Sequence, residues 1–429
     1  MKIVFFWFRR DLRLEDNIAL NKALDTGYRV QPLFIFDSNI IDELDDQDPR
    51  VSFIYSNLEK INSQLQQYGS SLLVKKGDPL TVWKEIISDY NIESVYFNHD
   101  YEPYAIARDK KITDLLRSKE IHAKSFKDQV IFEKDEVIKA DGTPYTVFTP
   151  YKNKWLQAFT QNTDPVKKNQ NTESLNPGKF RFPDLKELGF RNSHIKVKPY
   201  DLDHLAEYDK SRDIPHLDSG SNLGPHLRFG TISIRKVVDL ALKANSTFLS
   251  ELIWREFFMQ ILFHFPSVIN SNFKSKYDGV IWRNDADEFN KWCLGRTGYP
   301  LVDAGMRQLN KTGYMHNRVR MIAAGFLCKH LLIDWKWGES YFASKLLDYE
   351  LSSNNGNWQW SAGTGCDAAP YFRIFNPSEQ LKKFDKELIY IKRWVPEYDT
   401  PDYSPPIIDH KFARARALDT YKSGLKNYS

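Results

Sequence analysis

Residues 3–36 read IVFFWFRRDLRLEDNIALNKALDTGYRVQPLFIF, and this stretch decides the fold of the N-terminal part of the chain. It opens with one short apolar run, Ile3–Phe8, and closes with another, Val30–Phe36. Between them, Asp16–Asp25 has apolar residues at the three-and-four spacing of a helix. Short apolar strands that alternate with amphipathic helices predict a parallel sheet covered on both faces.

The same alternation continues to about residue 130. We expect further strands at Ser71–Val74 and Val95–Asn98, and further helices at Val51–Tyr68, Pro79–Tyr90 and Ala105–Ser118. The sequence therefore predicts an α/β domain with a Rossmann-like parallel sheet over residues 1–130.

The N-terminal apolar run could be mistaken for a secretory signal. It stops at Arg9-Arg10-Asp11 without a small-residue cleavage site, so we interpret it as a buried strand. No other apolar run approaches the roughly 18 residues of a membrane helix. Three widely spaced cysteines argue against disulfides or a zinc site and favour the cytoplasm. We expect no metal, no membrane association and a monomer.

Residues 131–200 lose this periodicity. Lys167–Leu175 and Asn176-Pro177-Gly178 are polar and rich in turn residues, which predicts a long interdomain connector. Its apolar anchors would be Tyr145, Phe148, Tyr151 and Trp155.

From residue 201 to 429 the pattern is helical. Helices are expected at Phe248–Phe265, Leu301–Leu309, Val319–Leu332 and Tyr341–Leu347. Ser340 is expected to cap one of them, and Asn310 to Gly313 to end another. An all-helical C-terminal domain follows from this pattern.

Tryptophan is unusually frequent in the helical part. Seven of the eleven tryptophans are Trp254, Trp282, Trp292, Trp335, Trp337, Trp358 and Trp360. Ordinary core filling is one explanation. The other is chemical, because several lie among charged and amide residues, and an indole can stack on a planar heterocycle or lose one electron.

Two helix faces and one loop could form a binding site. Asn317, Arg320 and Met321 would share a face, with Asp348 and Glu350 as possible carboxylate partners for the guanidinium. The alternative is a solvated face. Glu251, Trp254 and Arg255 would share another, at a pocket edge or on the surface. The loop 220–224 could present backbone N–H groups to a phosphate, or be only a loop.

Together these strings closely resemble the photolyase/cryptochrome family from Phe5 to about Pro396. Residues 7–17 (WFRRDLRLEDN) resemble the opening motif of the family. Residues 297–309 (TGYPLVDAGMRQL), 313–321 (GYMHNRVRM), 358–360 (WQW) and 367–377 (DAAPYFRIFNP) are highly specific. The resemblance implies an N-terminal α/β domain, a C-terminal helical domain that holds FAD, and light-driven repair of cyclobutane pyrimidine dimers in UV-damaged DNA.

The resemblance also implies roles by position. The flavin shell would be Tyr208, Gly220, Ser221, Asn222, Leu223, Gly224, Phe248, Arg255, Asn317, Arg320, Asp348, Tyr349, Glu350 and Asn354. The tryptophans that photoreduce the flavin would be Trp358, Trp335 and Trp282, in order from flavin to surface. The pocket for a flipped dimer would contain Glu251, Trp254, Met321 and Trp360, and the DNA contacts would include Arg212, Arg318, Asn317 and Gln380.

The chemistry implied is electron transfer from photoexcited reduced FAD to the flipped dimer. Damaged pairing lowers the cost of flipping, and aromatic walls give the bases stacking partners. Asn354 would face flavin N5 as a neutral amide, which favours the anionic reduced flavin because a carboxylate there would oppose added charge.

The chain departs from the family pattern at three places. Gly220 and Gly224 stand where the phosphate loop usually has hydroxyls, and Glu350 stands where an aspartate is usual. Tyr104 and Ala105 replace the glutamate and asparagine of folate-using relatives, so a methenyltetrahydrofolate antenna is in doubt. A deazaflavin, another flavin or an empty antenna site remain open.

Three other functions compete with dimer repair: a cryptochrome-type light sensor, repair of (6-4) photoproducts, and a helical nucleic-acid-binding module with a structural flavin. Asn354, the complete lesion pocket and an end about 30 residues past Trp394-Val395-Pro396 favour repair over sensing. Met321 stands where (6-4) repair would need a histidine.

Overall fold

A computed structural model describes residues 2–161 and 171–427. The chain forms two compact units, each built from discontinuous stretches. Unit 1 comprises Met1–Glu136, Gln157–Tyr200 and Asn222–Lys243, and unit 2 comprises Val137–Leu156, Asp201–Ser221 and Ala244–Ser429. The three consecutive domains expected from the sequence stay a prediction.

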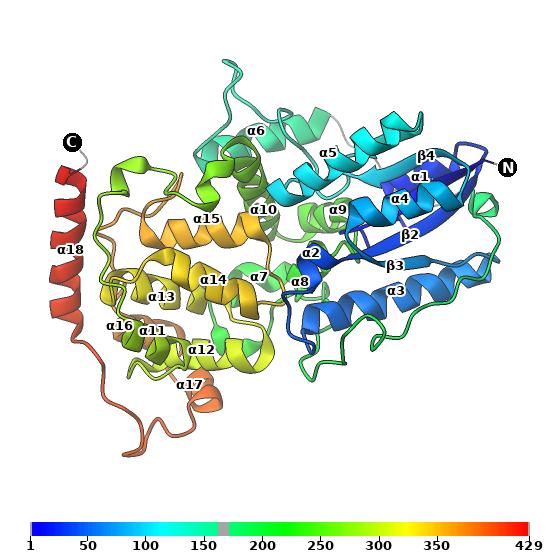
Figure 1. The fold of residues 1–429 in the computed structure, drawn as a ribbon. Helices are drawn as coiled ribbons and strands as arrows, with labels where there is room; N and C mark the ends of the chain where they lie inside the picture. The colour runs from blue at the N-terminus through cyan, green and yellow to red at the C-terminus, as the bar shows by residue number, and fades with distance from the viewer. Residues whose placement is uncertain (1, 162–170, 428–429) are drawn as a thin grey trace. The chain divides into compact units, whose positions relative to one another are not determined.

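Unit 1 contains a five-stranded parallel sheet in the order β3-β2-β1-β4-β5 (Figure 1). The strands are β1 Ile3–Phe8, β2 Arg29–Asp37, β3 Leu73–Gly77, β4 Ile92–Asn98 and β5 His122–Phe126. The helices are α1 Ile18–Leu24, α2 Ser38–Ile41, α3 Pro49–Gln67, α4 Pro79–Asp89, α5 Pro103–Ser118, α8 Leu223–Arg228 and α9 Ile234–Ala244, with the 3₁₀ turn η1 Thr172–Ser174.

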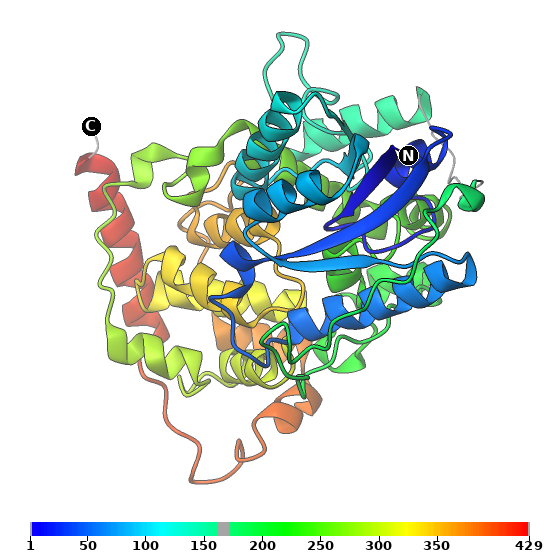
Figure 2. The same ribbon diagram turned by 45° about the vertical axis from the view of Figure 1, so that its right-hand side comes forward.

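Both faces of the sheet are buried. Alternate residues of β1 point to opposite faces, so the strand contributes side chains to two cores. Phe6 and Phe8 pack in a core with side chains of α1 and α3. Phe5 and Trp7 pack in a second core with side chains of α4 and α5. Figures 1 and 2 show α3 along one side of the strands, and Figure 1 shows α4 and α5 on the other. The predicted parallel sheet is therefore confirmed.

β5 was not expected from the sequence. Its residues, His122–Phe126, are half-buried or exposed, and include two basic side chains. An edge strand covered on fewer sides needs no continuous apolar run, so hydrophobic pattern alone does not reveal it.

Unit 2 is helical, as predicted. Its helices are α7 Tyr208–Ser211, α10 Ser246–His264, α11 Ala286–Cys293, α12 Pro300–Thr312, α13 Asn317–Gly325, α14 Trp335–Lys345, α15 Leu351–Ala362, α16 Pro377–Phe384, α17 Ile389–Trp394 and α18 His410–Asn427. Short turns are η2 Leu205–Glu207, η3 Pro215–Leu217, η4 Pro266–Ile269, η5 Ser275–Tyr277 and the π-helix η6 Phe326–His330.

Two expectations about helix ends were wrong. Val319–Leu332 is not one helix, because α13 gives way to the π-helical turn η6 after Gly325. Ser340 lies inside α14, which begins at Trp335 with the Asp334 carboxylate as its cap. By contrast, Gly313 ends α12 in the left-handed conformation, as expected.

The expected connector is not irregular throughout. It contains α6, Phe148–Gln161, which begins in unit 2 and ends in unit 1. Tyr151 and Trp155 are buried, and Trp155 Nε1 donates to Glu256 Oε1 at 2.6 Å within unit 2. The polar stretch 167–170 lies outside the described residues. No helix in the described part of the chain is long and apolar enough to cross a membrane.

Candidate functional site

Eleven of the predicted site residues lie on three helices of unit 2. α10 carries Phe248, Glu251, Trp254 and Arg255, α13 carries Asn317, Arg318, Arg320 and Met321, and α15 carries Asn354, Trp358 and Trp360. α10 and α15 approach closely at Gly356, where an added Cβ would overlap the Phe258 ring. The glycine therefore permits the close contact that brings these two sets of side chains together.

Two arginine–carboxylate pairs join these helices to the loop before α15. Arg255 forms a forked pair with the buried Glu350, with Nε 3.2 Å from Oε2 and Nη2 3.3 Å from Oε1. Arg320 Nη2 lies 3.0 Å from Asp348 Oδ2, and Arg320 Nε donates to the Met315 carbonyl at 2.7 Å. The expectation that Glu350 could also serve Arg320 was wrong, because Arg255 engages both of its oxygens.

Asn354 is held in one orientation by Glu339, a residue that the sequence interpretation missed. Asn354 Nδ2 donates to the backbone carbonyl and to Oε1 of Glu339, both at 3.0 Å. A carbonyl can only accept, so the amide cannot be turned over. Its Oδ1 accepts no hydrogen bond from the described residues. Asn354, Asn355 and Gly356 lie inside α15.

Burial raises the pKa of Glu339, while the bond from Asn354 opposes the rise. The half-buried carboxyl is therefore shifted toward its neutral form. No short-range sequence signal pairs Glu339 with Asn354, since they are on different helices and meet only through the packing of α14 on α15.

Trp254 is stacked on Phe148, the first residue of α6. Their ring centroids are 3.7 Å apart and their planes differ by 8°. The backbone N–H of Phe148 donates to Asp367 Oδ2 at 3.0 Å. Phe148, expected only as an apolar anchor, thus covers part of the indole, and Trp254 remains half-buried.

Glu251 forms an ion pair with Arg212, with Nη1 to Oε1 at 2.7 Å. The Arg212 guanidinium also lies over the Tyr208 ring, 5.4 Å from its centroid, and Tyr208 meets Phe248 edge-on. Burial, followed by the nearby Glu251 carboxylate, raises the pKa of Tyr208 to about 12. Four predicted residues are therefore contiguous, and Glu251 is charge-paired at the edge of this group.

Arg318 is paired with Asp213, which the sequence interpretation did not single out. Arg318 Nη2 lies 2.6 Å from Asp213 Oδ1, and the guanidinium lies over the Phe384 ring. Arg318 Nη1 lies 3.8 Å from Met321 Sδ. Burial lowers the pKa of the neighbouring His316, the cap of α13, to about 4, so its imidazole is neutral at physiological pH.

The three relay tryptophans share one hydrophobic cluster. Trp358 and Trp335 are buried in it, whereas Trp282 is half-buried and packs at its border. Gly338 makes room for Trp358, since a Cβ there would overlap the indole. Trp335 Nε1 donates to Asn272 Oδ1 at 2.9 Å. Trp282 is the most exposed of the three, and the order of Trp358 and Trp335 in the relay stays a prediction.

The remaining predicted residues are less closely associated. In unit 2, Asn317 and Gly220 are exposed, while Ser221, Tyr349, Trp360 and Gln380 are half-buried. No side-chain hydrogen bond of Trp360 or Gln380 is recorded among the described residues. Asn222, Leu223 and Gly224 belong to unit 1, where Asn222 precedes α8 in the left-handed conformation.

The stretch 101–109, expected to bear on an antenna pigment, is engaged with its own unit. Tyr104 donates to Asp37 Oδ2 at 2.7 Å, and Ala105 is buried. The hollow beside Tyr104 and Arg108 measures about 100 Å³, below the roughly 300 Å³ at which ligand pockets begin. These residues do not fit a folate held by a carboxylate and an amide.

The donor set of unit 2 does fit a flavin. Two guanidinium groups suit an electron-rich, anionic ring system, and their carboxylate partners keep the site near neutrality. Asn354 offers an acceptor with no competing donor in the described residues. No group of three or more His, Cys, Asp or Glu within residues 2–161 and 171–427 is arranged to hold a metal ion.

Comparison with known proteins gives the family of the chain. Residues 4–170 match the family model described as DNA photolyase, and residues 248–401 match the FAD binding domain of DNA photolyase. A deoxyribodipyrimidine photo-lyase from Synechococcus is 38% identical over 92% of this chain and 88% of its own length.

Solved structures are similarly close. A class III photolyase from Agrobacterium tumefaciens superposes with a TM-score of 0.87 at 34% identity, over 99% of this chain and 98% of its own. A cryptochrome from Synechocystis also gives a TM-score of 0.87, at 25% identity, over 98% of this chain and 99% of its own. The chain belongs to the DNA photolyase family.

Proposed function

We propose that this chain repairs cyclobutane pyrimidine dimers in UV-damaged DNA, driven by blue light and bound FAD. The observation that carries the proposal is the pair of α10 and α15. α10 presents a stacked tryptophan beside a paired glutamate, and α15 presents an amide whose oxygen accepts no hydrogen bond from the described residues. Relatives named deoxyribodipyrimidine photo-lyase support the same reaction.

The chain's own side chains would bind and orient both partners. Arg255, Arg320 and Asn354 would hold the flavin, with Phe248 and Tyr208 beside it. Trp254 would stack on the dimer once it is flipped out, and Glu251 would hydrogen-bond a base edge. When bound, the reduced flavin supplies the electron that splits the dimer and receives it back.

Asn354 has a specific electrostatic task in this proposal. Its N–H groups are committed to Glu339, so its Oδ1 would accept a hydrogen from the flavin edge. A neutral acceptor at that place adds no negative charge against a reduced, anionic ring.

Arg212 and Arg318 would contact DNA phosphates, with Asn317, Met321, Trp360 and Gln380 around the lesion. Both arginines are now paired with carboxylates, so DNA would have to replace Glu251 or Asp213 as their partner. We also propose that the protein acts in the cytoplasm as a monomer.

The proposal is tested by repair of a defined substrate. The purified, FAD-loaded chain with chemically reduced flavin is expected to restore a single thymine dimer in an oligonucleotide under blue light, as followed by chromatography. The same mixture in the dark is the control. Illumination with reduced flavin that leaves the dimer intact would refute dimer repair.

Replacing Trp254 by alanine is expected to weaken binding of dimer-containing DNA by about 1–3 kcal/mol, because one base loses its stacking partner. Phe148→Leu is expected to weaken binding less, since the indole stays but loses its ring contact. Binding to undamaged duplex is the control, and should change little in either variant. Fluorescence anisotropy with damaged and undamaged oligonucleotides measures both.

Glu339→Gln is expected to keep Asn354 oriented, because glutamine still offers an oxygen acceptor. The pKa of Glu339 is higher in the folded protein than its ordinary value of about 4. The folded state of the parent protein therefore loses stability as the pH rises from about 4 through the folded-state pKa, because the carboxyl must then ionise in a half-buried place. The variant should therefore gain melting temperature at about pH 8 and much less at about pH 5. An equal gain at both pH values would contradict this explanation.

Light sensing of the cryptochrome type is the second candidate. The similar fold of the Synechocystis protein is compatible with it, but the higher identity to photolyases favours repair. Repair of (6-4) photoproducts gains no support, since Met321 and a neutral, capping His316 offer no acid near the lesion pocket.

A further inference from the structure

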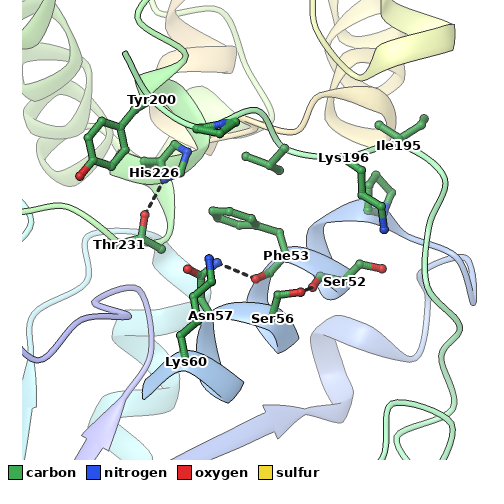
Figure 3. Close-up of a pocket in the computed structure, with 13 residues that line it drawn as sticks. Ser52, Phe53, Ser56, Asn57, Lys60, Ile195, Lys196, Tyr200, His226 and Thr231 are labelled. Atoms are coloured by element: carbon green, nitrogen blue, oxygen red, sulfur yellow. Dashed lines mark hydrogen bonds between the residues drawn. The ribbon is translucent and has the colours of Figure 1, made fainter. Parts of the chain in front are cut away.

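A hollow of about 470 Å³ lies within unit 1 (Figure 3). None of the residues given a role in repair lines it. Its walls are one face of α3, the extended segment 195–200, and the region of His226 and Thr231. Its volume falls within the range of about 300–1,000 Å³ that is typical of small-molecule sites.

The face of α3 that lines the hollow is not built for packing. Ser52, Phe53, Ser56, Asn57 and Lys60 recur at three-and-four spacing, so they share one face of the helix. A core stripe at this spacing would carry large apolar side chains. Here two serines and an asparagine surround a single phenylalanine, which leaves open space above the ring.

One end of the hollow is aromatic and rigid. The centroids of Phe53 and Tyr200 lie 5.3 and 5.0 Å from that of His226, both nearly perpendicular to it. His226 Nε2 donates to the Lys198 carbonyl at 2.9 Å, and Nδ1 pairs with Thr231 Oγ1 at 2.8 Å. Burial lowers the pKa of His226, which stays neutral. A planar ring would find apolar contacts here.

The rim of the hollow is positively charged. Lys60 and Lys196 both line it, both are exposed, and neither has an ion-pair partner among the described residues. None of the lining residues is acidic. Unpaired ammonium groups beside an aromatic wall favour a ligand that combines a flat ring with an anionic group.

We propose that this hollow binds a mononucleotide, with its base against the Phe53 ring and its phosphate near Lys60. The site is separate from the residues proposed for repair and would add a second, small-molecule ligand to the protein. Adenine and flavin mononucleotides share the required chemistry, so the experiment must distinguish them.

The test is calorimetric titration of the full-length, FAD-loaded protein in the dark and without DNA. AMP and FMN are titrated in separate runs, with adenosine and ribose 5-phosphate as fragments. At least one nucleotide is expected to bind. Adenosine lacks the phosphate and should lose a charge-assisted contact, and ribose 5-phosphate lacks the ring and should lose a stacking contact. Each should bind at least about ten-fold more weakly than the nucleotide.

Two substitutions locate the binding. Ser56→Trp fills the hollow from an exposed position on α3, and should abolish binding. Lys60→Glu reverses one rim charge, and should weaken binding at least about ten-fold. The matched control is Lys84→Glu, which reverses an exposed lysine on α4 outside the hollow, and should leave affinity unchanged.

The proposal is overturned if neither nucleotide binds up to about 1 mM. It is also overturned if Lys60→Glu and Lys84→Glu bind equally well. The FAD content and melting temperature of Ser56→Trp would reveal whether that variant fails to fold. If it does, Lys60→Glu at the surface still decides the test. Because the assay uses neither light nor damaged DNA, its failure would leave the repair proposal untouched.

Discussion

Replacing Arg255 by glutamine is expected to destabilise unit 2 by about 3–5 kcal/mol, because it leaves the buried Glu350 carboxylate without its cation. Arg255 joins α10 to the loop that starts α15, and both elements carry proposed flavin contacts. We therefore expect the variant to lose FAD as well as melting temperature. Flavin absorbance per chain and thermal unfolding measure the two effects.

The size of this effect depends on burial, which a matched control can show. Lys243→Ala removes a partner of the exposed Asp239, with an Nζ–Oδ2 distance of 2.8 Å. A surface pair of this kind should cost no more than about 0.5 kcal/mol. The double variant Arg255→Gln/Glu350→Gln should recover part of the loss, since the uncompensated charge is gone. Equal losses in Arg255→Gln and Lys243→Ala would contradict the assignment.

Trp282→Phe is expected to abolish photoreduction of oxidised flavin, while repair by chemically reduced enzyme continues at the normal rate. Phenylalanine keeps most of the apolar contact of Trp282 in its cluster, but it cannot supply an electron at an accessible potential. Trp282 is the relay residue with a partly exposed side chain, so its loss would leave an electron hole confined to buried Trp335 and Trp358. Flavin absorption under steady blue light follows the reduction.

Trp337→Phe is the control for this experiment. Trp337 packs against the same cluster and is also half-buried, but its ring contact is with Phe289 and it has no relay role in the proposal. Photoreduction should survive in Trp337→Phe. If Trp282→Phe lost repair even with pre-reduced flavin, the electron-relay assignment would be wrong.

Elements with a strong local pattern could be predicted from the sequence. β1 begins and ends at the residues expected, Ile3 and Phe8, because a fully buried strand must be apolar on both faces. α10 and α12 were found within a few residues for the same kind of reason, as an apolar helical face repeats at three-and-four spacing. β5 lacks such a pattern and was missed.

The candidate site was predicted only in part. Resemblance to the family supplied Arg255, Arg320, Trp254 and Asn354, and the structure places them on facing helices. It could not supply their partners. The stacking of Phe148 on Trp254 joins residues more than 100 positions apart, and depends on how α6 packs in unit 2.

The sequence by itself determined the parallel α/β sheet, the helical part and the family, because periodicity and specific motifs are written in neighbouring residues. Tertiary structure alone decided that Glu350 serves Arg255, while Arg320 takes Asp348. It alone decided that Glu339 fixes the orientation of the Asn354 amide by accepting its N–H groups. These choices depend on distances of about 3 Å between helices, and such distances are set by packing rather than by spacing along the chain.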